Sequence, residues 1–339
     1  MAELKRRKLI LDVDTGSDDA MAMIAAMMSP EFEVIGVCSV NGNREVKLTT
    51  LNTLRVMELL NSNVPVYRGC EYPMVSTLDR KPMLPYREGD LDGTDIGVIH
   101  GDHLPLPGPT WRKEEDLNAV SYYVKTLRET KEKITLVPVG PLTNIAMAMR
   151  CDPRICENIE EIMIMGGGYL INNTPSPMAE YNVWVDPEAA EVMMFYAEKY
   201  GVKVTWVPLD ATHECWMSKA DADEMRKIGS PIADAMADFV EQRAVGYAKD
   251  ADMKALGASP VHDALAVIAL LNPDVLVDVR HVNVHIHIGG GYCDGMTCLD
   301  MRELIDKPAP NCYFALHANR EIFCEEMMRI LKNNTVYSK

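Results

Sequence analysis

Short runs of apolar and β-branched residues alternate along this chain with segments of helical periodicity. The apolar runs predict strands at residues 8–14, 33–40, 134–139, 159–165 and 202–209. The periodic segments between them predict helices at residues 18–28, 45–60, 117–129, 142–149 and 187–200. Strands that alternate with helices usually form a parallel sheet with crossover helices. We therefore expect an α/β fold with an open, mostly parallel, Rossmann-like sheet flanked by helices.

The C-terminal third follows a less regular pattern. It predicts two helices within residues 219–250, one at 260–271 and one at 319–331. Residues 281–288 alternate as an antiparallel strand that leads through three glycines into a small hairpin near the C-terminus. A proline-rich stretch at 71–111 predicts an irregular functional cover or interface. Without a linker or an internal repeat, the simplest interpretation is a single domain over residues 1–339.

Charge and cysteine usage narrow the functional classes. The chain of 339 residues has 34 basic and 50 acidic side chains and a formal net charge of −16, which argues against nucleic-acid binding and favours a neutral small molecule or a metal cation. Nine scattered cysteines without CxxC spacing indicate reduced thiols, with a zinc site as the minor alternative. The charged start and the apolar run broken at Asp12 predict neither a signal peptide nor a membrane span, so we expect a cytoplasmic protein.

Four carboxylates gather directly after the first predicted strand. Asp12, Asp14, Asp18 and Asp19 fall within eight residues behind an apolar run. Ionised carboxylates this close repel one another and resist leaving water, so such a cluster normally holds a cation or performs acid–base chemistry. Asp18 and Asp19 taken alone are also explained by the first turn of a helix capped by Ser17, where the helix dipole favours negative charge. That explanation does not extend to Asp12 and Asp14.

Four further segments lie at the ends of predicted strands or the starts of predicted helices. They are Asn41-Gly42-Asn43, Gly140-Pro141-Leu142-Thr143-Asn144, Met165-Gly166-Gly167-Gly168 and His262-Asp263. The first, taken alone, favours an ordinary turn, and the second is equally compatible with a turn and with a bend whose carbonyls face a cation. The glycine run lets the backbone approach a ligand, and the amide and carboxylate side chains at positions 172, 173, 180 and 182 suit sugar hydroxyls. A His-Asp pair at the head of an apolar helix is compatible with ligand binding, catalysis or a simple dipole contact.

Taken together and in order, these segments resemble the nucleoside hydrolases of the inosine–uridine-preferring type. The matching blocks are Asp12-Val13-Asp14-Thr15-Gly16-Ser17-Asp18-Asp19-Ala20, Gly42-Asn43, Ile99-His100-Gly101-Asp102, Gly140-Pro141-Leu142-Thr143-Asn144, Met165-Gly166-Gly167-Gly168, Ala179-Glu180-Tyr181-Asn182, Asp186-Pro187-Glu188-Ala189 and His262-Asp263-Ala264. Each block alone is weak, but the ordered set is specific. The resemblance implies an open α/β core and a bound Ca2+. It also implies hydrolysis of the N-glycosidic bond of ribonucleosides, with modified ribonucleosides among the candidate substrates, to free base and ribose.

The resemblance also implies roles for individual residues. The calcium ligands would be the side chains of Asp14, Asp19 and Asp263 and the backbone carbonyl of Thr143, an oxygen-only set that suits a hard cation. The substrate-binding residues would be Asp18, Asn43, His100, Met165, Asn173, Glu180 and Asn182. Asn172 is a rival for Asn173, because the spacing to Glu180 is one residue longer than the family pattern. A homo-oligomer, dimer or tetramer, is also implied.

A mechanism follows from these assignments as a hypothesis. Calcium would lower the pKa of a bound water, and Asp14 would take its proton as general base. Attack at C1′ from the face opposite the base predicts inversion, with the carboxylates stabilising an oxocarbenium-like ribosyl cation. His262 would protonate the departing base. The sequence departs from the family pattern after Asp102, in the region that includes Trp111. This region and the helices near Tyr247 would shape the base pocket. The sequence therefore does not determine which base is preferred.

Two alternatives remain at this stage. Asp12-Val13-Asp14-Thr15 after an apolar run also fits a phosphatase of the haloacid-dehalogenase type, with Asp12 as nucleophile, Asp14 as acid–base group and Mg2+ as cofactor. That interpretation leaves the later blocks unexplained. The second alternative is a catalytically silent homologue that binds nucleoside or calcium.

Overall fold

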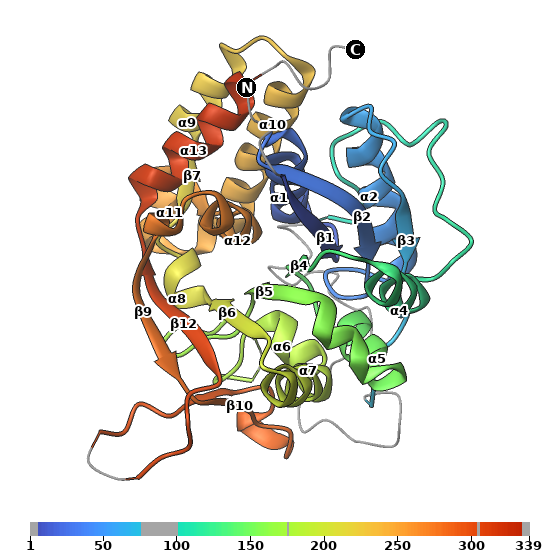
Figure 1. Cartoon of the computed structure of the whole chain (residues 1–339). Coiled ribbons are helices and arrows are strands. Elements are labelled where there is room, and N and C mark those ends of the chain that lie inside the picture. Colours follow the sequence, from blue (N-terminus) through green and yellow to red (C-terminus); the bar gives the residue numbers. More distant parts are fainter. Residues whose placement is uncertain (1–5, 76–100, 175, 304–305, 334–339) are drawn as a thin grey trace, which may run out of the picture.

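A mixed, mostly parallel sheet of eight strands forms the centre of the molecule (Figure 1). The computed structural model describes residues 6–75, 101–174, 176–303 and 306–333. The strand order is β3-β2-β1-β4-β5-β6-β12-β9, and only β9 runs antiparallel to its neighbour within this sheet. The strands are β1 (Arg7–Val13), β2 (Phe32–Ser39), β3 (Val66–Arg68), β4 (Ile134–Pro138), β5 (Ile159–Met165), β6 (Lys203–Val207), β9 (Leu276–Val282) and β12 (Cys312–Ala318). The predicted α/β class is confirmed.

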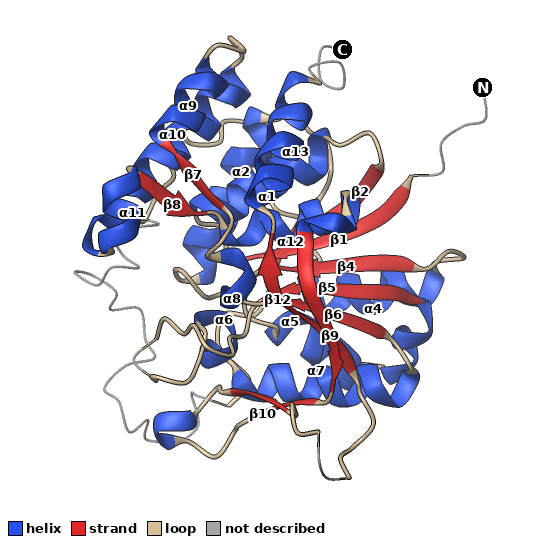
Figure 2. Ribbon diagram, turned by 90° about the vertical axis from the view of Figure 1, so that its left-hand side faces the viewer, coloured by secondary structure: helices blue, strands red, loops and turns tan. Residues whose placement is uncertain are grey.

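Helices cover both faces of this sheet (Figure 2). One face carries α1 (Ser17–Met28), α2 (Val46–Leu59), α10 (Pro231–Gly246), α12 (His262–Leu271) and α13 (Arg320–Lys332). The other carries α4 (Ala119–Glu129), α5 (Thr143–Cys151) and α7 (Pro187–Tyr200). Successive side chains of a strand point to opposite faces, so Leu9 and Leu11 pack in the first core and Ile10 in the second. Burial on both faces explains why β1 is a continuous apolar run.

The remaining strands form two small antiparallel pairs outside the central sheet. β7 (Trp216–Ser218) pairs with β8 (Ala258–Pro260), and β10 (Val284–Ile286) pairs with β11 (Thr297–Leu299). The short helices are α6 (Tyr181–Val185), α8 (Leu209–Thr212), α9 (Lys219–Arg226) and α11 (Ala251–Leu256), with 3-10 turns at Pro153–Asn158, Tyr247–Lys249, Pro273–Val275 and Gly291–Cys293. The predicted C-terminal hairpin is confirmed in β10 and β11. Its strand is shorter than expected, because Val282 and the residue before it belong to β9.

One local prediction needs correction. Gly16, not Ser17, occupies the N-cap of α1, and Ser17 is already the first helical residue. The Asp19 carboxylate takes over the capping contact by accepting a hydrogen bond from the backbone N–H of Gly16 (2.8 Å). Of the irregular stretch at 71–111, residues 76–100 lie outside the described part, and residues 101–111 contain neither helix nor strand.

The nine cysteines all lie in the described ranges, and each is free. Every helix in the described ranges is too short or too polar to cross a bilayer.

Candidate active site

The loop between β1 and α1 carries the first acidic residues of the site. Asp14 follows the last residue of β1, and Asp18 and Asp19 lie in the first turn of α1. The Asp19 carboxylate accepts hydrogen bonds from the backbone N–H groups of Asp14 (3.1 Å) and Gly16 (2.8 Å). These bonds fix the turn and satisfy amides at the helix start. The loop lies at the carboxyl end of a central strand, where open α/β sheets bind ligands.

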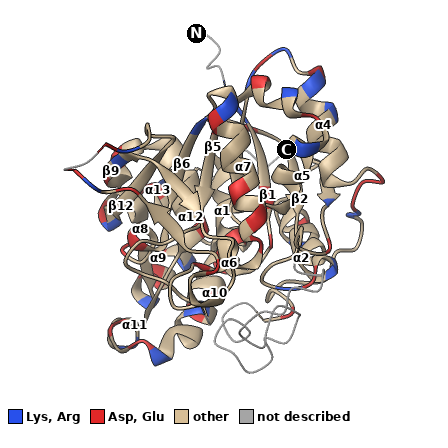
Figure 3. Ribbon diagram, turned by 90° about the horizontal axis from the view of Figure 1, so that it is seen from below, with Lys and Arg blue, Asp and Glu red and all other residues tan. Residues whose placement is uncertain are grey.

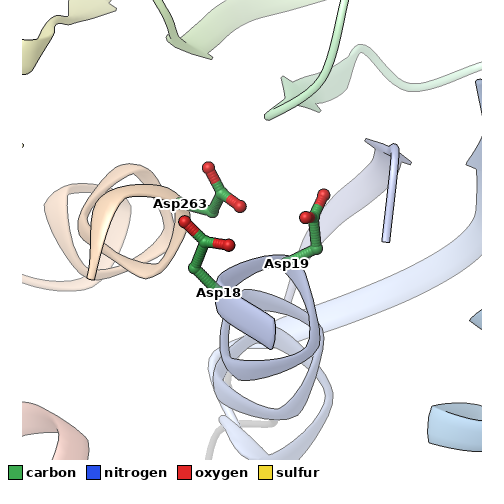
Figure 4. A group of neighbouring side chains, drawn as sticks. All are labelled: Asp18, Asp19 and Asp263. Carbon is green, nitrogen blue, oxygen red and sulfur yellow. The ribbon is translucent and has the colours of Figure 1, made fainter. Parts of the chain in front are cut away.

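Three buried carboxylates meet where α1 faces α12. Figure 4 shows Asp18 and Asp19 at the start of α1 and Asp263 at the start of α12, with their carboxylates directed toward a common space. One oxygen from each lies within 4.8 Å of the others, and all three side chains are buried. This acidic group (Asp18, Asp19 and Asp263) offers only oxygen ligands, which is the donor chemistry that Ca2+ and Mg2+ prefer. The group can therefore hold a metal ion.

Asp14 lies beside the acidic group and is held by the loop after β2. The backbone N–H of Asn43 donates to its Oδ2 (2.7 Å), and the Asn43 side-chain amide lies 3.4 Å from Asp19 Oδ2. Two glycines press against the Asp14 carboxylate: a Cβ on Gly42 would lie 2.1 Å from Oδ2, and one on Gly140 would lie 2.8 Å from Oδ1. Both positions therefore require glycine if Asp14 is to keep this orientation.

Burial and mutual repulsion raise the pKa values of these carboxyl groups. Burial, helped by the charge of Asp18, raises the pKa of Asp19 to about 7. Burial likewise raises the pKa of Asp14 and of Asp263 well above the usual range, and neighbouring carboxylates add to both. In Figure 3, Asp and Glu lie around the ends of β1 and α1 near the middle of the view, and Lys and Arg lie mainly toward the outside. A bound cation would offset this concentration of negative charge, so the residues present fit a metal site.

Amide and carboxylate groups from three other loops complete the pocket. Glu180 is the N-cap of α6 and accepts hydrogen bonds from the backbone N–H groups of Asn182 (2.8 Å) and Gly167 (2.9 Å). Burial raises the pKa of Glu180 to about 7. The Asn182 amide donates to the backbone carbonyls of Val139 (2.8 Å) and Met165 (3.2 Å), so the ends of β4 and β5 are joined beneath the pocket.

The imidazole of His262 is held at both ring nitrogens. Nδ1 lies 2.7 Å from the Thr212 hydroxyl, and Nε2 lies 2.7 Å from the hydroxyl of Tyr247. The ring of His213 is 5.3 Å away, centre to centre. Burial raises the pKa of Tyr247 to about 12, so its hydroxyl is protonated at neutral pH. Tyr247 and His262 therefore form a hydrogen-bonded chain that ends in the pocket and can move a proton.

One pocket brings most of the predicted residues together. Its lining consists of Asp14, Asp18, Asn43, Val139, Met165, Asn173, Glu180, Tyr181, Asn182, Tyr247, His262 and Asp263. Asn173 is part of the lining and its rival Asn172 is not. Asp19 lies next to the lining, in the acidic group. Thr143 is also outside the lining: it begins α5, and its hydroxyl donates to Asp186 (2.6 Å), so its carbonyl as a metal ligand stays a prediction. His100 lies outside the described residues.

The structure adds residues that sequence reasoning missed. Arg243 on α10 is fully buried and forms an ion pair with Asp18 (2.9 Å). The Tyr181 hydroxyl donates to the carbonyl of Gly42 (2.7 Å) and ties α6 to the loop of Asn43. The sequence pattern could have indicated its burial, because Arg243 lies on the same face of α10 as the buried residues Met236, Phe239 and Val240.

Two other sequence expectations fall outside this pocket. Asp12 is buried behind it, where its carboxylate accepts hydrogen bonds from the Tyr123 hydroxyl (2.9 Å) and the Asn144 amide (3.1 Å). It is not part of the lining, so the role of phosphatase nucleophile does not fit it. Trp111 is half-exposed and contacts the guanidinium of Arg112, 5.2 Å from the ring centre, so it is not in the base pocket.

Comparison with known proteins identifies a consistent set of relatives. The family model described as inosine-uridine preferring nucleoside hydrolase matches residues 9–325. A curated relative, the pyrimidine-specific ribonucleoside hydrolase RihB of Escherichia coli O17:K52:H18, is 35% identical over 306 residues, which cover 90% of this chain and 91% of the relative.

Solved structures give the same result. The plant nucleoside hydrolase PpNRh1 superposes with a TM-score of 0.83 at 26% identity, covering 96% of this chain and 99% of that one. The purine-preferring ribonucleoside hydrolase from Gardnerella vaginalis superposes with a TM-score of 0.81 at 29% identity, covering 96% and 98%.

Proposed function

The chain belongs to the inosine-uridine preferring nucleoside hydrolase family and is a ribonucleoside hydrolase, and we propose that it cleaves pyrimidine ribonucleosides with Asp14 as general base and with Tyr247 and His262 as proton donors to the base. The observation that carries the mechanism is the shared pocket, which Asp14, Asp263 and the Tyr247–His262 pair all line. Because these residues come from both ends of the sequence, we propose that residues 1–339 form one catalytic domain.

We propose that the resident cation is Ca2+, held by Asp14, Asp19 and Asp263 together with the carbonyl of Thr143. Oxygen ligands on several elements and a high density of negative charge support this choice. The cation would supply Lewis acidity, which lowers the pKa of water in the pocket and neutralises the carboxylates. Asp14, Asp19 and Asp263 would then be ionised, which they resist on their own because burial raises the pKa of each.

Asp14 acts as the base in the hydrolytic step. The backbone N–H of Asn43 donates a hydrogen bond to Oδ2 of Asp14, so the Asp14 carboxylate is oriented before substrate binds. Asp14 takes a proton from the water that attacks C1′, the C1′–N bond breaks, and positive charge develops on the ribose. Ionised carboxylates in a pocket shielded from water stabilise that charge. Attack opposite the departing base inverts the configuration at C1′. Asp18, Asn43, Asn173, Glu180 and Asn182 would bind the ribose hydroxyls, with Met165 beneath the sugar.

The departing base requires a proton, and the second part of the pocket can supply it. The hydroxyl of Tyr247 donates its proton to the base, and the resulting phenolate takes one from Nε2 of a doubly protonated His262, which is left neutral and is reprotonated from solvent. Thr212 holds the opposite ring nitrogen and keeps the imidazole in this orientation. General acid catalysis of this kind contributes about 10²–10⁴-fold to a rate.

The choice of pyrimidine nucleosides is supported by identity to the curated relative. RihB of Escherichia coli shares 35% of residues with this chain, against 29% for the purine-preferring enzyme of Gardnerella vaginalis. Ribose release from uridine, cytidine, inosine, adenosine and guanosine tests this choice, with p-nitrophenyl phosphate as a negative control. Turnover confined to uridine and cytidine is expected. Faster turnover of purine nucleosides would contradict the base assignment and leave the chemistry intact. Light scattering tests the expected homo-oligomer.

The mechanism itself is tested by Asp14→Asn. The change keeps the volume of the side chain and removes the base, so turnover should fall by about 10³-fold or more while the unfolding transition is retained. Near-normal turnover by a folded Asp14→Asn variant would refute Asp14 as general base.

A further inference from the structure

A fully buried arginine connects the two elements that carry the acidic group. Arg243 lies near the C-terminal end of α10, and its side chain has 0% exposure. An arginine stays charged inside a protein and is costly to bury without partners. Its burial in this position therefore calls for an explanation in terms of what the guanidinium contacts.

The guanidinium of Arg243 binds both sides of the acidic group. Nη1 forms an ion pair with Asp18 Oδ1 at the start of α1 (2.9 Å) and lies 3.4 Å from the Ser17 hydroxyl. Nε and Nη2 both donate to the carbonyl of Pro260 (3.1 and 2.8 Å), two residues before α12 begins. A planar fork with fixed donors can hold two partners in one relative position, which a lysine ammonium cannot do in the same way.

The same helix end reaches the proton-donating part of the pocket. Tyr247 directly follows α10, and its ring lies 5.8 Å from the Arg243 guanidinium carbon. Asp18 lines the pocket, whereas Arg243 is outside the lining and cannot touch substrate. Any effect of Arg243 on the reaction must therefore act through the residues that it holds.

We propose that Arg243 is a positioning residue, which is anchored on the carbonyl of Pro260 and orients Asp18 toward the ribose. This inference rests on the proposed role of Asp18 in binding ribose. Misplacing a positioned group by about 1 Å can cost about 100-fold in rate. Arg243→Met removes the ion pair that orients Asp18, so kcat/KM should fall by about 100-fold.

A double-mutant cycle between Arg243 and Asp18 tests the inference. If Arg243 acts through Asp18, Arg243→Met should cost about 100-fold in the wild-type background and no more than about threefold in an Asp18→Asn background. An unfolding curve for each variant establishes that it is folded. If Arg243→Met does not fold, Arg243→Lys enters the cycle with the same criterion. Arg226→Met is the matched control, because it removes an arginine paired with Asp238 and Glu241 on the surface of α9 and α10, and its kinetics should equal wild type.

Three results would overturn the inference. Equal losses from Arg243→Met in both backgrounds would mean that Arg243 does not act through Asp18. Unchanged kcat/KM in a folded Arg243→Met variant would mean that it has no positioning role. An Asp18→Asn variant with wild-type kinetics would refute the ribose role of Asp18 as well, which separates failure of the proposed function from failure of this inference alone.

Discussion

Removing one carboxylate from the acidic group should make the metal-free protein more stable. The carboxylates of Asp18, Asp19 and Asp263 lie within 4.8 Å of one another. Two unit charges at this separation repel by roughly 3 kcal/mol at the effective dielectric constant that suits protein sites. Asp263→Asn removes the charge and keeps the side-chain volume. Partial protonation already relieves some repulsion, so we expect the free energy of unfolding to rise by about 2 kcal/mol.

Urea unfolding followed by circular dichroism measures this change at pH 8, with chelator and with Ca2+. Under the proposed assignment, the free energy of unfolding of the wild type should rise on adding Ca2+, because a ligand that binds only the folded state stabilises it. The Asp263→Asn variant should gain little stability from Ca2+ and should lose turnover. The matched control is Asp210→Asn, another buried aspartate, whose carboxylate accepts hydrogen bonds from the backbone N–H groups of Tyr169 (2.7 Å) and Leu170 (2.8 Å). The free energy of unfolding of this control should fall by about 1–3 kcal/mol, and its stabilisation by Ca2+ should be retained.

The reasoning fails if Asp263→Asn lowers the free energy of unfolding in chelator. It also fails if the variant gains as much from Ca2+ as wild type does, because the acidic group would then not be the cation site.

Three further outcomes follow from the same geometry. The pKa of Asp19 rises from 3.8 to about 7 on folding, so the contribution of this group to the stability of the metal-free protein is lost as pH rises through this interval. The increase in Tm on adding Ca2+ should therefore grow from pH 4 to 7 in a fluorimetric scan. A constant increase would contradict this prediction. Gly42→Ala should lower kcat by about 100-fold by displacing Asp14, while Gly108→Ala, with open space around its Cβ, should have no effect. Tyr247→Phe should slow nucleoside hydrolysis by about 100-fold but spare a nitrophenyl riboside, whose leaving group needs no proton; equal losses on both would refute the proton relay.

The central strands of the fold were predictable because burial on both faces leaves a continuous apolar signature. β1, β4 and β6 have it over most of their length, and β2 and β5 have it after the glutamates near their starts. β3 was missed because three residues are too few to form a pattern. β9 was missed because five of its seven residues are exposed at the edge of the sheet, and β12, its partner, was missed with it.

The candidate site was predictable where the chemistry is concentrated in one segment. The acidic loop after β1 was recognised from spacing alone, and the ordered motifs added Asp263 to it. Arg243 was missed because arginine is nearly always exposed, so a charged residue in a helix suggests a solvated face. Its partners, Asp18 and Pro260, are distant in sequence and come together only when α10 packs against α1. Gly16 displaced Ser17 from the N-cap because the side chain of Asp19 supplies the capping bond.

The meeting of α1 and α12 has a consequence for the order in which the molecule is made. The ribosome makes Asp18 and Asp19 long before Asp263, because α1 and α12 lie far apart in the sequence. The acidic group can therefore form only after α12 has been made and has packed against α1. Until then the charge of Asp263 adds no repulsion to Asp18 and Asp19.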